Sequence, residues 1–129
     1  MTVNDLTGIV LILVPIAFNV VFFALGRAFE YPDILRKPTD HILKRFAEGG
    51  SRLIALWYAF AVTALFAIPM ALLFQQVFAA EQPALAGASA IIGALSGLVQ
   101  AMGLFRWMFL VPKLATQYSA ESASQASRD

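Results

Sequence analysis

The sequence predicts an all-α integral membrane protein with three transmembrane helices and a short amphipathic interfacial helix in the cytoplasmic loop. Three stretches, residues 6–26, 53–80 and 82–105, contain no charged side chain. Each reaches the roughly 20 apolar residues that a helix needs to cross a bilayer core about 30 Å thick. The composition agrees, because 60% of the residues are hydrophobic and 13% are charged, whereas soluble domains are about 25% charged.

These stretches should be helices, since backbone polar groups in hydrocarbon must find partners within the protein. No series of alternating segments of about ten residues, the pattern of a membrane barrel, occurs in the chain. We therefore expect spans at residues 6–26, 53–77 and 84–108, within a single membrane domain of residues 1–118. Residues 119–129 are rich in Ser and Ala, and we expect them to form a polar flexible tail.

The basic residues predict the orientation of the spans. All nine Lys and Arg residues lie between the first and second spans or after the third. Residues 1–5 and the turn around Glu81 contain none. Because Lys and Arg in short loops remain in the cytoplasm, we expect the N-terminus outside and the C-terminus, like the long loop, in the cytoplasm.

Two kinds of residue within the spans predict helix packing. The third span carries small residues at four-residue intervals, which lie on one helix face: Ser89, Gly93, Gly97 and Ala101. Such a face lets another backbone approach closely, and the partner is either a span of this chain or a span of another protein. Asn19 and Gln100 are polar residues within the spans. We expect them either to join helices by hydrogen bonds or to bind a substrate. Pro15 and Pro69 should each remove a helical hydrogen bond and kink the helix.

The loop between the first two spans holds the candidate interaction residues, which are Glu30, Tyr31, Asp33, Arg36, His41, Lys44 and Arg45. A helix at residues 39–48, ended by the glycine pair at 49–50, would have apolar and basic faces. It either lies on anionic lipid or docks onto a partner protein. Aromatic residues at the span ends indicate an interfacial belt or a ligand cage; they are Phe29, Tyr31, Trp57, Tyr58 and Trp107.

Several classes of chemistry lack the residues they need. The chain has one histidine and no cysteine, so we expect no metal site and no catalytic residues. No acidic or basic side chain lies at the mid-depth of a span, which argues against proton pumps, ion-coupled carriers and voltage sensors. The loop carboxylates have basic neighbours and should form a charge network, and the mixed charge excludes a nucleic-acid partner.

A resemblance covers nearly the whole chain. The run from Phe29 to Thr39, followed by Arg45-Phe46, Gly49-Gly50 and Leu56-Trp57-Tyr58, resembles a bacterial family of polytopic membrane proteins described only as a domain of unknown function. The segment from Gly103 to Pro112 is similar to a later part of that family. The resemblance implies the bacterial inner (cytoplasmic) membrane, and further spans after a polar segment such as residues 119–129. It implies no activity and no catalytic residues.

Two functions fit these observations. The first is a non-enzymatic accessory or structural subunit of a larger bacterial membrane complex, which packs through small-residue helix faces. The alternative is a lipid- or small-ligand-handling membrane protein, which could be an interfacial enzyme that uses the cytoplasmic loop. Expected partners are membrane lipids and other transmembrane subunits or further copies of the chain. No cofactor is predicted, although bound lipid or a pigment held by a partner is compatible with either function.

Overall fold

The computed structural model describes residues 2–127 and shows an all-α chain, with no strand in that range. The elements are α1 (Val3–Phe29), a 3-10 helix (Asp33–Arg36), α2 (Thr39–Leu65), α3 (Ala67–Phe78), α4 (Pro83–Phe109) and α5 (Val111–Ala126). Three rods, namely α1, α2–α3 and α4–α5, contain apolar windows long enough to cross a membrane. The predicted all-α class is confirmed, and three helices long and apolar enough to cross a membrane are present.

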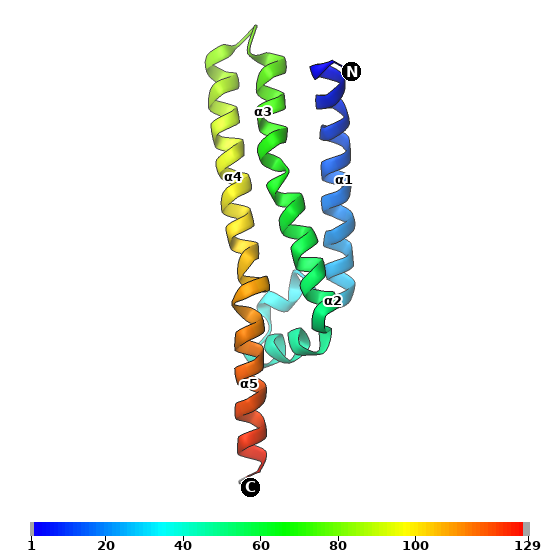
Figure 1. The fold of residues 1–129 in the computed structure, drawn as a ribbon, viewed down its shortest axis with the longest axis vertical. Coiled ribbons are helices and arrows are strands. Elements are labelled where there is room, and N and C mark those ends of the chain that lie inside the picture. The colour runs from blue at the N-terminus through cyan, green and yellow to red at the C-terminus, as the bar shows by residue number, and fades with distance from the viewer. Residues whose placement is uncertain (1, 128–129) are drawn as a thin grey trace.

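The three rods lie side by side, and α2–α3 occupies the middle (Figure 1). A short turn joins α3 to α4 at the end of the bundle where α1 begins, and α5 extends beyond the opposite end (Figure 1). Helices α1 and α4 both pack against α2 and α3 but hardly touch each other. A groove lined by residues of α1, α2, α3 and α4 lies between α1 and α4 on the middle rod.

Two of the three proline positions considered coincide with helix breaks. The break between α2 and α3 lies at Phe66. Pro69, three residues later, has no N–H to donate to the carbonyl of Leu65, so one helical hydrogen bond is missing at this point. Pro112 has the same effect at the junction of α4 and α5. Pro15, by contrast, lies within α1, which continues as one helix from Val3 to Phe29. A helix break therefore occurs near Pro69, as expected. No break occurs at Pro15, because α1 continues through it.

Helix α2 changes direction at Gly50, whose backbone angles are φ 54° and ψ −150°. These angles belong to a region that is open essentially to glycine alone. The segment before Gly50 runs across the bundle, whereas the segment after it joins the middle rod (Figure 1). Helix α2 therefore begins at Thr39 and bends at Gly50, and an interfacial helix at residues 39–48 stays a prediction.

The structure differs from the sequence-based expectation at the C-terminal tail. Residues 119–126 continue α5 as exposed helical turns instead of an irregular tail. The physical reason is local, because no glycine or proline follows Pro112 within α5 and alanine is the strongest helix former. Residues 128–129 of the predicted tail lie outside the described residues.

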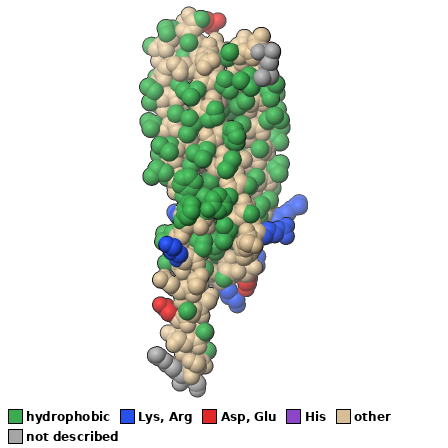
Figure 2. Space-filling view, viewed as in Figure 1, with side chains coloured by type: hydrophobic (Ala, Val, Ile, Leu, Met, Phe, Trp, Pro, Cys, Tyr) green, Lys and Arg blue, Asp and Glu red, His purple; other side chains and the backbone are tan. Residues whose placement is uncertain are grey.

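The surface is apolar along most of the bundle. Figure 2 shows hydrophobic side chains over its upper part, with Lys and Arg confined to the lower part of the visible face. Many large apolar residues of α1 and α4 are exposed, including Ile12, Val20, Ile92 and Val99. Such a surface suits a multi-pass membrane protein, in which lipid covers these side chains. We call the end with Arg27, Arg52 and Arg106 the basic end.

Candidate functional site

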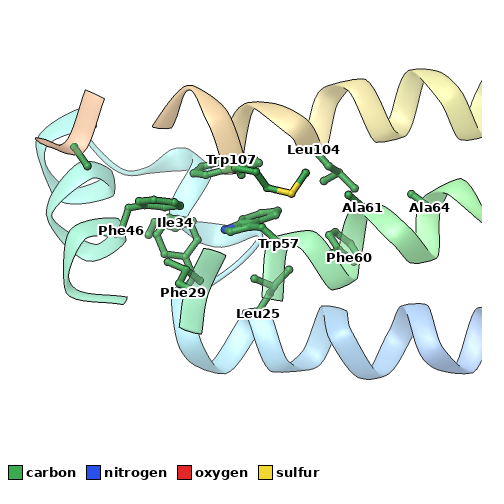
Figure 3. Close-up of a cluster of buried hydrophobic side chains, with 13 residues drawn as sticks. Leu25, Phe29, Ile34, Phe46, Trp57, Phe60, Ala61, Ala64, Leu104 and Trp107 are labelled. Atoms are coloured by element: carbon green, nitrogen blue, oxygen red, sulfur yellow. The ribbon is translucent and has the colours of Figure 1, made fainter. Parts of the chain in front are cut away.

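An aromatic cluster forms part of the hydrophobic core at the basic end (Figure 3). Trp57 of α2 stacks on Trp107 of α4, with ring centroids 4.6 Å apart and an interplanar angle of 5°. Phe29 from the end of α1 meets both rings edge-on, at 6.0 Å from Trp57 and 5.3 Å from Trp107. Aromatic pairs in these two geometries are favourable. The cluster thus joins all three rods.

This burial changes the interpretation of the aromatic residues at the span ends. Phe29, Trp57 and Trp107 are buried in the core instead of forming a lipid-facing belt. Tyr31 is half-buried and packs edge-on to Trp57 at 5.2 Å, and Tyr58 alone of the five is exposed. The rings of Phe29, Trp57 and Trp107 pack directly against one another within this cluster.

The apolar face of the segment before Gly50 packs against the same cluster. Phe46 is buried and meets Phe29 edge-on at 5.8 Å, while Ile42 and Leu43 are partly buried beside it. The predicted amphipathic face is therefore covered by this chain's own core. Lys44 and Arg45, on the other face, are exposed and half-buried respectively.

A charge cluster links this segment to the end of α1. Glu30 accepts a hydrogen bond from Arg45 Nε at 3.1 Å, and Arg45 Nη1 reaches Glu48 at 3.3 Å. His41 Nε2 lies 3.8 Å from Glu30, beyond hydrogen-bond distance. Glu30 ends α1 in the left-handed conformation, with φ 56°. The cluster is open to solvent, so each exposed pair contributes little to stability.

The other candidate loop residues lie apart from this cluster. Asp33, Arg36 and Lys44 are exposed, and they take no part in the ion pairs found among residues 2–127. In the same range no group of three His, Cys, Asp or Glu side chains is arranged to hold a metal ion. Glu30, Arg45 and Glu48 thus connect the segment before Gly50 to the end of α1. The other candidate loop residues do not converge with them on one pocket.

The small-residue face of α4 packs against the middle rod. A Cβ atom on Gly93 would lie 2.7 Å from the Ala71 Cβ atom, and one on Gly97 would lie 3.3 Å from the carbonyl oxygen of Ala64. Ala101 is buried on the same face. In the structure this face therefore packs on helices of the same chain.

One residue of the predicted small-residue face lies outside it. Ser89 is exposed, whereas Ala86 and Ala90 are buried toward the start of α4. A strict four-residue interval drifts around an α-helix, which has 3.6 residues per turn. The buried positions from Ala86 to Trp107 are three, four or seven residues apart, which is the spacing of one helix face.

The intramembrane polar residues meet in the groove between α1 and α4. Asn19, Thr63 and Gln100 all line one cavity of about 220 Å³. Asn19 donates from Nδ2 to the Pro15 carbonyl at 2.8 Å, and Thr63 donates to the Phe60 carbonyl at 2.7 Å. The Gln100 side chain has no hydrogen bond within residues 2–127, so the expected bond across helices is not formed by Asn19 and Gln100. We call this cavity the amide groove.

A second cavity opens at the basic end between α1 and α2. Its volume is about 560 Å³, and Arg27 and Arg52 both line it, together with Glu48. We call it the arginine pocket. In the sequence, these arginines indicate only the orientation of the spans. Their positions could have indicated that they lie close together, because Arg27 directly follows one charge-free stretch and Arg52 directly precedes the next.

Comparisons with known proteins place the chain in a family but assign no activity. Neither the comparison with curated proteins nor that with solved structures gives a match. A family model described as Domain of unknown function (DUF4386) matches residues 6–129. The match covers the three rods and the whole basic end, and the chain therefore belongs to this family of unknown function.

Proposed function

We propose that this protein is a non-enzymatic subunit of a larger bacterial inner-membrane complex, and that the amide groove receives a transmembrane helix of another chain. The observation that carries the proposal is Gln100, whose amide lies in an apolar rod without a hydrogen-bond partner among residues 2–127. An amide exposed to hydrocarbon is unfavourable unless it is paired. Another helix with a polar side chain would supply the missing partner.

The packing of the bundle supports the same proposal. Helices α1 and α4 lie on either side of the middle rod and leave the amide groove between them. In the most apolar 18-residue stretch of α1, only 6% of the residues are buried, whereas 28% are buried in the corresponding stretch of the middle rod. A helix placed in the groove would contact both outer rods and cover the amides. The occupant would be another subunit or a second copy of this chain.

The orientation of the subunit follows from the charge distribution. The basic end would face the cytoplasm and the turn at Glu81 would face outside, because Lys and Arg are retained on the cytoplasmic side. In this placement the segment from Thr39 to Gly49 would lie at the membrane surface with Lys44 toward lipid headgroups or water.

A second candidate function is the handling of a lipid or a small ligand, and the amide groove also favours it. The cavity brings three polar side chains together in an apolar surface, which is a common property of ligand sites. The charge cluster of Glu30, Arg45 and Glu48 does not line the groove. A ligand there would be held without the loop residues, so the interfacial-enzyme version of this function has less support.

Photo-crosslinking in native membranes distinguishes the two functions. The chain has no cysteine, so Met70→Cys introduces a single attachment point for a benzophenone maleimide in the groove and keeps Gln100 in place. Leu72→Cys is the matched control, because Leu72 is exposed on the same helix and does not line the groove. We expect illumination to attach a protein of one discrete mass at position 70 and not at position 72. Lipid adducts alone at position 70 would overturn the subunit proposal in favour of ligand handling.

A further inference from the structure

We propose that the arginine pocket binds the phosphate group of an anionic phospholipid. The pocket is distinct from the amide groove, because it lies between α1 and α2 and shares no lining residue with it. Its role is therefore independent of whether the protein is a subunit.

The charge in the pocket favours an anion. Arg27 and Arg52 contribute two guanidinium groups, and the ion pairs among residues 2–127 include neither of them. Glu48, the acidic residue of the lining, is already engaged with Arg45 at 3.3 Å. Guanidinium groups bind phosphate oxygens through paired N–H donors. Two arginines without acceptors in one pocket therefore provide the donors that a phosphate group requires.

The backbone around the pocket keeps it open. Gly49 lies in the wall and has no side chain to occupy the space, and a Cβ atom there would meet the Leu53 side chain at 2.7 Å. The break at Gly50 directs the preceding helical segment across the bundle (Figure 1). As a result, Glu48 and Arg52 come from opposite sides of the break and line the same pocket.

The depth of the pocket favours a lipid over a soluble phosphate. Each arginine lies at the end of a charge-free span. The ends of such spans lie at the depth of the lipid phosphates. Leu53 and Leu56 line the same pocket and continue along the middle rod, so an acyl chain could follow them into the hydrocarbon. Inorganic phosphate would use the arginines alone and would gain nothing from the leucines.

Native mass spectrometry of the detergent-solubilised full chain tests the proposal. Phosphatidylglycerol and phosphatidylcholine are added separately, and the bound fraction is measured for the native protein and for Arg27→Gln/Arg52→Gln. We expect the double variant to lower phosphatidylglycerol affinity by about 10- to 30-fold, since each basic residue near the lipid surface contributes about a factor of five. Phosphatidylcholine binding should be weak in both proteins.

A charge-matched control separates a specific site from general attraction. Arg36→Gln/Lys37→Gln removes the same charge from exposed residues that do not line the pocket. It should keep the native affinity, and equal losses in the two double variants would overturn the proposal. Arg27→Lys/Arg52→Lys retains the charge and should recover part of the lost binding, because lysine attracts a phosphate group but cannot hold it through paired N–H donors.

Competition with inorganic phosphate identifies the source of the phosphate group. Millimolar phosphate should leave bound phosphatidylglycerol in place, because it lacks the apolar part that contacts Leu53 and Leu56. Full displacement of the lipid by phosphate at that concentration would assign the pocket to a soluble anion and overturn the lipid proposal.

Discussion

Trp57 and Trp107 form a stacked indole pair that joins α2 to α4, with centroids 4.6 Å apart and planes 5° from parallel. The two rings differ in one respect. Trp57 is fully buried and its Nε1 atom has no hydrogen-bond partner within residues 2–127, whereas Trp107 has no such unpaired buried atom. The pair therefore combines favourable ring packing with one unpaired buried donor.

Replacing the two tryptophans by phenylalanine should have unequal effects. Trp57→Phe loses part of the stacked area but also removes a buried unpaired N–H, a group that costs about 1–3 kcal/mol. Trp107→Phe loses a similar ring area without that compensation. We expect Trp57→Phe to lower the free energy of unfolding by at least about 1 kcal/mol less than Trp107→Phe.

Unfolding of the two variants by SDS in mixed micelles, followed by circular dichroism, measures this difference. The native protein serves as the reference, and Met102→Ala, an exposed position on α4, should change stability little. A larger loss for Trp57→Phe than for Trp107→Phe would mean that the Trp57 N–H makes a stabilising contact.

The contact between Gly93 and Ala71 should not tolerate a larger side chain at position 93. Gly93→Ala places a Cβ atom 2.7 Å from the Ala71 Cβ atom, closer than atoms of packed helices approach. We expect the clash to separate α3 from α4 and to cost about 1–3 kcal/mol, as overpacking does. Ala71→Gly removes the opposing atom, so Gly93→Ala/Ala71→Gly should recover most of the loss.

A double-mutant cycle of these variants, measured as midpoints of thermal unfolding in detergent, gives the coupling between the two positions. The matched control is Gly103→Ala on the same helix, where an added Cβ atom meets nothing within 4 Å. It should be neutral or slightly stabilising, because alanine favours the helix over glycine by up to about 1 kcal/mol. Absence of rescue in the double variant would contradict the packing of α3 on α4.

The turn at Gly50 should depend on glycine for conformational reasons alone. A Cβ atom at this position meets nothing within 4 Å, but the φ of 54° combined with ψ of −150° is strained for other residues. Gly50→Ala should therefore destabilise the protein by about 1–3 kcal/mol. The measurement is again the unfolding midpoint in detergent.

Gly8→Ala is the appropriate control, since Gly8 lies in α1 with open space around it. It should leave the midpoint unchanged or raise it slightly. If Gly50→Ala behaved like Gly8→Ala, the helix would run straight through residue 50, and the arginine pocket would lose the break that opens it.

Local features of the chain were sufficient to predict the all-α class and the three apolar helices. A helix satisfies its own backbone hydrogen bonds, so the length of an apolar stretch and the position of charged residues indicate where each span lies. The break near Pro69 and the bend at the glycine pair were also predictable, because both depend on residues adjacent in the sequence.

The tertiary structure alone decided which faces meet. Spacing could not tell whether Gly93 and Gly97 contact this chain or another, and packing places them on the middle rod. The tryptophans expected at the lipid interface are buried because rings from three separate rods fill one space. The arginine pocket joins residues from α1 and α2 in the same way. Contacts between distant segments depend on the position of whole helices, whereas the sequence of a segment specifies only that segment's own hydrogen bonds and its solubility in lipid.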